Sequence, residues 1–274
     1  MKKRNFSKVI PYVILSIIAL LFILPLLWVF TSSLDPHAAA GIKLPDKLTV
    51  QNFIDILANP SNQRSFIIGI ILSLSQAVLV VVFSALAAYP LSRYQIKYKK
   101  QFILSILFMT CLPITAVMVP VYQLFIYLNL QDSLMGTIFF LAASALPFGI
   151  WMMKNFMDSI PLELEEAAWV DGASTLKSLT KVILPLMVPG TFTVMIYTFI
   201  GSWGNFFVPY ILIQSPNKFP ASVTIYQFFG QHGMVEYGRL AAFSVIYMLP
   251  VVILYILSQS HMSKGFSLGG ASKG

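Results

Sequence analysis

Charged residues are scarce in this chain of 274 residues, because Asp, Glu, Lys and Arg together make up only 10% whereas hydrophobic residues make up 57%. Soluble globular domains carry about 25% charged residues. A run of roughly 20 apolar residues is long enough for a helix to cross the hydrocarbon core of a bilayer, and several such runs occur here. The composition excludes an ordinary soluble domain and predicts an all-α polytopic membrane protein.

Cysteine and histidine are also rare. Cys111 is the only cysteine, so no disulfide within the chain and no cysteine-based metal site is possible. It lies in an apolar run, where we expect it to be a small core residue. The three histidines are far apart in sequence (His37, His232 and His261). We therefore predict no metal site.

Acidic residues are absent from the apolar runs themselves. Transporters driven by protons or sodium ions usually place ionisable groups at membrane depth, so this absence argues against transport powered by the chain alone. The chain also lacks a G-x-x-x-x-G-K-[ST] sequence for binding ATP phosphates. An intramembrane hydrolase would need a catalytic arrangement inside an apolar run, such as HExxH or paired aspartates, and none is present.

Six apolar segments are predicted to span the membrane, at about residues 9–30, 66–89, 102–128, 134–156, 183–211 and 240–260. Pro113 and Pro120 are expected to bend or unwind the third span. Prolines and glycines between Pro185 and Gly204 interrupt the fifth. Residues 33–65 contain three prolines, including Pro60, which disfavour long helices there. No linker is long enough to separate soluble domains, so one membrane domain over residues 1–274 is the simplest interpretation.

The basic residues support six spans with both termini in the cytoplasm, because cytoplasmic segments carry an excess of Lys and Arg. Of the 18 basic residues, the cytoplasmic segments of this map hold Lys2, Lys3, Arg4, Lys8, Arg93, Lys97, Lys99, Lys100, Lys154, Lys177, Lys181, Lys264 and Lys273. The other five (Lys43, Lys47, Arg64, Lys218 and Arg239) lie outside. Topology thus explains the net charge of +8 without a nucleic-acid partner.

Half of the acidic residues fall within residues 158–171, between the fourth and fifth spans. Ser159 is expected to cap a helix whose first turn contains Pro161. Gly172 should end this helix, and Ser174 should cap a second one. Such a polar segment in an apolar protein indicates a solvated role.

The first of these helices has one thin side, because Ala167 and Ala168 add little bulk. Leu164 and Trp169 can contact a partner beside them. We interpret the segment as a docking surface for a soluble protein. An amphipathic helix lying on the membrane surface is the alternative.

The same segment resembles the EAA loop of permease subunits in binding-protein-dependent ABC importers, through Glu166-Ala167-Ala168, Gly172, Val182 and Leu184-Pro185 at the family's spacing. Val182 replaces the family's usual Ile. Three further stretches are similar to maltose-type permeases: Leu48–Phe53, the tract 203–209, and the glycine-rich tail.

This resemblance implies a MalG-like permease of the type I ABC importer fold, in the bacterial cytoplasmic membrane. The loop at about 157–181 would sit in a cleft of an ATPase subunit, and the tail 261–274 would reach the ATPases. The implied ATPase-coupling residues are Glu165, Glu166, Ala167, Ala168, Asp171, Gly172, Leu184 and Pro185.

The implied partners are a second permease subunit, two ATPase subunits that bind ATP and Mg, and an extracytoplasmic sugar-binding protein. The chain itself would bind no cofactor and catalyse no reaction. A permease for a non-sugar solute, such as a glycerol-phosphate-like one, and a membrane scaffold without transport activity remain alternatives.

Trp203, Asn205 and Tyr210 in the fifth span are candidates for lining a translocation path. Aromatic faces and amides suit the hydroxylated ring of a sugar. Anchoring at the membrane interface, for the aromatic residues, and hydrogen bonding between helices, for Asn205, stay open as alternatives.

Overall fold

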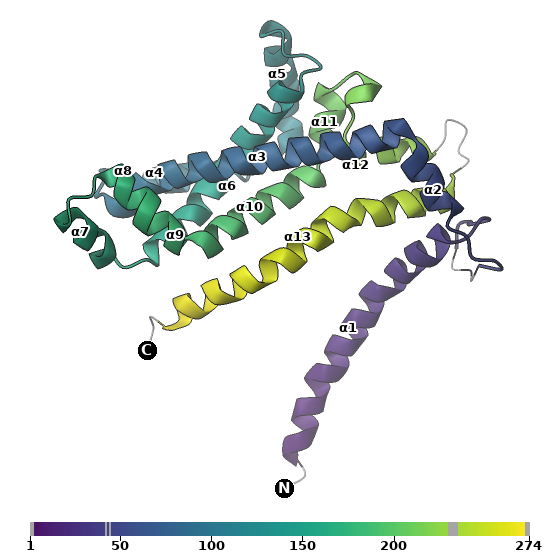
Figure 1. The fold of residues 1–274 in the computed structure, drawn as a ribbon, viewed down its shortest axis with the longest axis horizontal. Helices are drawn as coiled ribbons and strands as arrows, with labels where there is room; N and C mark the ends of the chain where they lie inside the picture. Colours follow the sequence, from purple (N-terminus) through teal and green to yellow (C-terminus); the bar gives the residue numbers. More distant parts are fainter. Residues whose placement is uncertain (1–2, 42, 44, 230–234, 272–274) are drawn as a thin grey trace. The chain divides into compact units, whose positions relative to one another are not determined.

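The structure, a computed structural model, describes residues 3–41, 43, 45–229 and 235–271, and over these residues it is helical without strands (Figure 1). The longer helices are α1 (Lys3–Ser33), α2 (Gln51–Ala58), α3 (Pro60–Arg93), α4 (Lys99–Met109), α5 (Ile114–Tyr127), α6 (Leu134–Asp158), α7 (Glu163–Val170), α10 (Val188–Trp203), α11 (Phe207–Leu212) and α13 (Tyr237–Ala271). Short pieces are α8 (Thr175–Ser178), the π-helical η1 (Leu179–Ile183), α9 (Leu184–Leu186), η2 (Pro216–Lys218), α12 (Ala221–Thr224) and η3 (Ile225–Phe229).

The chain forms two compact units. Unit 1 comprises Met1–Gln63 and Thr224–Leu249, and unit 2 comprises Arg64–Val223 and Pro250–Gly274. The helices α3 and α13 run from one unit into the other.

Within the described residues, four helices are long and apolar enough to cross a membrane: Val9–Ser33, Pro60–Arg93, Leu134–Asp158 and Tyr237–Gln259. Two bent pairs raise this number to six if each pair is one span. The helices α4 and α5 meet at 89°, and Thr175–Leu186 meets α10 at 78°. The predicted break near Pro113 is confirmed, since Pro113 stands in extended conformation before α5.

Two local predictions are wrong. Cys111 is exposed at the break between α4 and α5 rather than packed in a core, because the helix stops there. Pro60 begins α3 instead of interrupting helical structure. Proline is tolerated at the first helical position, where its missing N–H has no helical partner, and the Asn59 side chain accepts a bond from the Ser61 amide at 2.9 Å.

In unit 1, Asn52 holds the loop that follows α1. Its Nδ2 donates to the carbonyl oxygens of Ser33 (3.1 Å) and Asp35 (3.0 Å). Arg239 of α13 forms an ion pair with Asp55 of α2 at 3.0 Å. The stretch Leu48–Phe53, which resembles a permease signature, thus has a structural role here through Asn52.

In unit 2, α3, α6 and α10 share a hydrophobic core, which includes Val80 of α3, Met153 of α6 and Val194 of α10. Glycines allow these helices to approach closely. A Cβ built at Gly149 would lie 2.7 Å from Val80, and one at Gly190 would lie 2.4 Å from Phe156.

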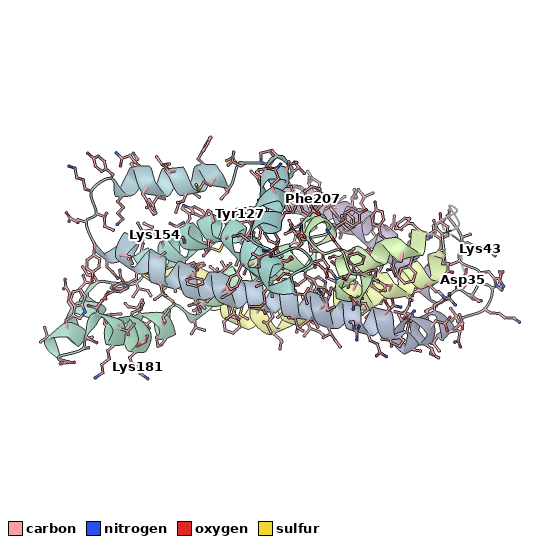
Figure 2. The ribbon with its side chains drawn as sticks, turned by 90° about the horizontal axis from the view of Figure 1, so that it is seen from above. Asp35, Lys43, Tyr127, Lys154, Lys181 and Phe207 are labelled. Atoms are coloured by element: carbon pink, nitrogen blue, oxygen red, sulfur yellow. The ribbon has the colours of Figure 1, made fainter. Side chains whose placement is uncertain are left out.

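A second cluster of buried side chains joins α5, α6 and α11 in unit 2. Its members are Met118, Phe125, Leu141, Val208 and Leu212. Figure 2 labels Tyr127, at the end of α5, and Phe207, at the start of α11, in this region. Two helical pieces of the predicted fifth segment, α10 and α11, are therefore packed in unit 2.

Candidate functional site: the hairpin between α6 and α10

The acidic segment between α6 and α10 forms a helical hairpin, α7 followed by α8, at the end of unit 2 where α3 and α6 also end (Figure 1). We call residues 163–178 the α7–α8 hairpin. Leu162, not Ser159, precedes α7. The predicted Ser159 cap is wrong because α6 continues to Asp158 and ends on Ser159, whose hydroxyl donates to the Phe156 carbonyl at 2.6 Å.

Gly172 ends α7 as the sequence predicts. Its φ is +81°, a left-handed conformation that glycine adopts readily. Its amide bonds the Trp169 carbonyl at 3.0 Å, and the Ala173 amide bonds the Ala168 carbonyl at 2.9 Å. These two bonds form a Schellman motif, which satisfies carbonyls at the helix end.

Ser174 caps α8, and its Oγ accepts a bond from the Lys177 amide at 3.4 Å, as predicted. The chain continues through η1 and α9 to the 78° bend before α10. Leu179 and Ile183 are buried in the core that α3, α6 and α10 share. Leu184, which is half-buried, and Pro185, which is exposed, lie in α9 just before this bend. The hairpin is thus anchored to the core through η1.

The outward face of the hairpin carries most of the implied coupling residues. Glu166, Ala167, Asp171 and Gly172 are exposed, and Ala168 is half-buried. Leu164 and Trp169 on α7 are exposed large hydrophobic side chains. An exposed carboxylate beside small and apolar side chains can accept a charge-assisted hydrogen bond from a closely approaching partner.

Basic side chains lie next to this acidic face. Lys177 on α8 and Lys181 on η1 are both exposed. Figure 2 shows Lys181 at the end of the molecule that carries α7 and α8. The hairpin therefore offers charges of both signs to a partner, around an apolar centre.

Glu165 faces the opposite way. Its side chain is 0% exposed, and its Oε2 lies 2.8 Å from Nε of Arg93, whose side chain is 6% exposed. The Tyr89 hydroxyl donates to Glu165 Oε1. Of the eight implied coupling residues, Glu165 is therefore held inside its own chain rather than presented at the surface.

Sequence reasoning missed Tyr89 and Arg93 as parts of this site. Arg93 was counted only as a topological charge. Their spacing of four residues at the end of an apolar run is a signal that both side chains share one helix face. That spacing does not indicate which of the three acidic residues of α7 contacts Tyr89 and Arg93.

The three candidate path residues lie around the second break of the fifth segment. Trp203 is 3% exposed, and its ring lies 3.0 Å from a Cβ built at Gly69. Asn205 Oδ1 accepts a bond from the Val208 amide at 3.0 Å and so caps α11. Tyr210 is 55% exposed and stacks on Phe206 with ring centroids 4.9 Å apart. Contact with a substrate stays a prediction for all three.

Apolar helices of membrane-spanning length, two bent segments and a protruding polar hairpin define a multi-pass helical membrane protein. Residues 81–267 match the family of binding-protein-dependent transport system inner membrane components. This match covers more than half of the chain, and the chain belongs to that family.

Relatives agree with this assignment. The chain is 30% identical over 255 residues to the trehalose transport system permease protein SugB of Mycobacterium tuberculosis, covering 92% of this chain and 93% of SugB. It is 27% identical to the trehalose/maltose transport system permease protein MalG of Thermococcus litoralis, covering 100% of both chains. The fold is similar to a chain of a bacterial ABC transporter involved in alginate import, with a TM-score of 0.82, 24% identity, and coverage of 95% of this chain and 98% of that chain.

Proposed function

We propose that this chain is a permease subunit of an ABC importer that moves a sugar or oligosaccharide across the bacterial cytoplasmic membrane. The relatives named above for trehalose and maltose support a sugar over the non-sugar alternative. The observation that carries the proposal is the α7–α8 hairpin, which presents Glu166 and Ala167 outward on a helix anchored to the core of unit 2.

The proposed topology has six spans with both termini in the cytoplasm. It counts each of the two bent helix pairs as one span. The excess of Lys and Arg in the loops assigned to the cytoplasm supports the orientation. The hairpin, which contains Lys177 and is followed by Lys181, then faces the cytoplasm.

The partners in this proposal are a second permease, two ATPase subunits and an extracytoplasmic sugar-binding protein. ATP and Mg bind to the ATPase subunits, and this chain is not an enzyme. Closure of the ATPases around ATP displaces the hairpin and turns the spans from inward-facing to outward-facing. The docked binding protein then releases its sugar into the cavity, and ATP hydrolysis resets the cycle.

Two parts of the chain have secondary roles in the proposal. Tyr210 is the most exposed of the three path candidates, so it is the first of the three to test for substrate contact. The glycine-rich tail reaches the ATPase dimer interface, and deletion of residues 265–274 is expected to lower transport without lowering the amount of protein in the membrane.

The test is co-purification of the tagged chain from membranes that contain the second permease and the ATPase. Ala168→Leu adds bulk where a partner must approach closely, and overpacking costs about 1–3 kcal/mol, roughly a ten- to hundredfold loss of docking. Glu166→Ala removes the outward carboxylate. Both variants are expected to reach the membrane in normal amounts, to retain less ATPase, and to lose the stimulation of ATP hydrolysis by a binding protein loaded with trehalose or maltose.

Ala40→Leu is the matched control, because it adds the same bulk at an exposed position that the proposal does not use. Normal ATPase retention by Glu166→Ala and Ala168→Leu would contradict the proposal. It would favour the alternative of a passive helix on the membrane surface.

A further inference from the structure

Glu165 is the one carboxylate of α7 that is withdrawn from solvent, although Glu163 and Glu166 on the same short helix are exposed. An ionised side chain buried in this way is stable only when it is paired and hydrogen-bonded. Arg93 supplies the pairing at 2.8 Å, and the Tyr89 hydroxyl donates to the other carboxylate oxygen. One oxygen of Glu165 is therefore ion-paired with Arg93 of α3, and the other accepts a hydrogen bond from Tyr89 of the same helix.

The two partners of Glu165 lie one turn apart at the end of α3. Residues four positions apart stack on one helix face, so Tyr89 and Arg93 contact Glu165 from the same side. Arg93 Nη1 also donates to the Ile160 carbonyl at 3.3 Å, which ties the segment before α7 to the same side chain. Three polar contacts thus connect α3 with the entry and first turn of α7.

The end of α3 is itself part of the packed core. Tyr89 and Ala88 are buried in the cluster that also holds residues of α6 and α10. The contacts of Glu165 thus connect α7 to this core directly through buried side chains, whereas the chain itself reaches the core by way of α8 and η1.

We propose that Glu165, Arg93 and Tyr89 form an internal link that transmits the movement of the α7–α8 hairpin to α3, so that they are positioning residues for coupling and not contacts to the ATPase. This inference rests on the proposed function, because it assigns the hairpin as the element that the ATPase displaces. It separates two roles among neighbouring acids: Glu166 docks, and Glu165 transmits.

The experiment uses the complete transporter in proteoliposomes with its binding protein. It measures three quantities: ATPase retention, ATP hydrolysis, and uptake of radiolabelled trehalose or maltose. Where neither sugar is carried, stimulation of ATP hydrolysis by the binding protein purified with its bound sugar replaces uptake. Glu165→Gln keeps the size of the side chain but leaves the Arg93 charge buried without its counter-charge. We expect near-normal ATPase retention and about a tenfold fall in uptake per ATP hydrolysed, because removing one partner of a buried ion pair is strongly disruptive.

Double substitution distinguishes a link from general damage. In Glu165→Gln with Arg93→Gln no buried charge remains unpaired, so we expect this variant to recover uptake per ATP above either single variant. Glu163→Gln is the matched control on the exposed side of α7. Ser92→Ala is the matched control on α3, because it removes a 2.6 Å hydrogen bond to Asp158 of α6 instead of a contact to α7. Both controls should keep the wild-type ratio.

Three outcomes would overturn the inference. The first is wild-type uptake per ATP hydrolysed in Glu165→Gln, and the second is a loss of ATPase retention in Glu165→Gln equal to that in Glu166→Ala. The third is a double variant whose uptake per ATP is no higher than that of the single variants. If Glu165→Gln does not accumulate in the membrane, Tyr89→Phe tests the link in its place, because it removes one hydrogen bond to Glu165 and leaves the ion pair with Arg93 intact. A wild-type ratio in Tyr89→Phe then counts against the link. A failure of the proposed function is distinguishable from a failure of the link, because the former appears as normal ATPase retention in the Glu166→Ala and Ala168→Leu variants.

Discussion

Asp132 and Lys218 form an ion pair of 2.7 Å across 86 positions of sequence. Asp132 lies in the turn between α5 and α6, and Lys218 ends η2, which follows α11. The Asp132 carboxylate also accepts bonds from the Ser215 hydroxyl (2.6 Å) and from the amides of Gln214 (3.0 Å) and Ser215 (2.9 Å). The Asp132 carboxylate therefore connects the turn between α5 and α6 to the segment after α11.

The first prediction concerns the pH dependence of this contact. Burial acts to raise the pKa of Asp132, but the bonds from Lys218 and Ser215 outweigh it and hold the pKa below its ordinary value of 3.8. The ionised carboxylate thus stabilises the folded protein. This contribution is complete above a pH of 3.8 and is lost as the pH falls below it.

Asp132→Asn is expected to lower the free energy of unfolding by about 1–3 kcal/mol at neutral pH, because it removes the negative charge that strengthens the hydrogen bonds from Lys218 and Ser215, two half-buried residues. The difference from wild type should shrink as the pH falls below 3.8. Thermal unfolding of the detergent-purified protein across this range measures it. Asp46→Asn is the control, since its ion pair with Lys43 is exposed and should matter little. A difference that does not vary with pH would contradict the assignment.

The second prediction concerns Gly172. A Cβ built there meets nothing within 4 Å, so the cost of Gly172→Val is backbone strain at φ +81° and not a clash. A left-handed conformation costs an L-residue about 1–2 kcal/mol. ATPase retention is expected to fall about 5- to 30-fold, which is the factor that this free energy represents.

Gly172→Asn should be tolerated better, since asparagine also ends helices in this conformation. Gly201→Val is the matched control, because Gly201 likewise has open space around its Cβ position, but its φ lies outside the left-handed range. Equal effects of the valine and asparagine substitutions at Gly172 would rule out backbone strain as the cause.

The third prediction tests the packing of α10 against α6. A Cβ at Gly190 would lie 2.4 Å from Phe156, so Gly190→Ala forces the helices apart or moves the ring. Overpacking of this kind costs about 1–3 kcal/mol, which should appear as a lower unfolding temperature in detergent. Adding Phe156→Ala should recover part of the loss. Gly201→Ala, at a position with open space, should change little.

The fourth prediction tests the proposed topology with cysteine labels at Lys97, Ser174, Asp46 and Asn217, all of which are exposed in the structure. Membrane-impermeant thiol reagents should label positions 97 and 174 only from the cytoplasm, and positions 46 and 217 only from outside. The native Cys111 is exposed and must first be replaced, for example by Cys111→Ser. Opposite accessibility at any two of the four positions would contradict the six-span arrangement.

The sequence predicts a helix end well where the cause acts within a few residues. Gly172 ends α7 because glycine adopts a left-handed φ, and Ser174 caps α8 through its hydroxyl. The helix breaks near Pro113 and after Pro185 because proline has no N–H to donate. The Ser159 prediction is wrong because α6 extends to Asp158, so the Ser159 hydroxyl bonds the end of that helix, and α7 begins only at Glu163.

The sequence by itself determined that this chain is a multi-pass helical membrane protein with a polar hairpin whose residues resemble the EAA loop. These conclusions rest on local features of the sequence: the length of the apolar runs, the positions of proline and glycine, and the Glu-Ala-Ala spacing. Only the tertiary structure decided that Glu165 turns inward to Arg93 while Glu166 stays outside. The two acids are adjacent in sequence and chemically identical. What separates them is which side of α7 packs against α3, and that depends on residues about 70 positions away that a local pattern does not contain.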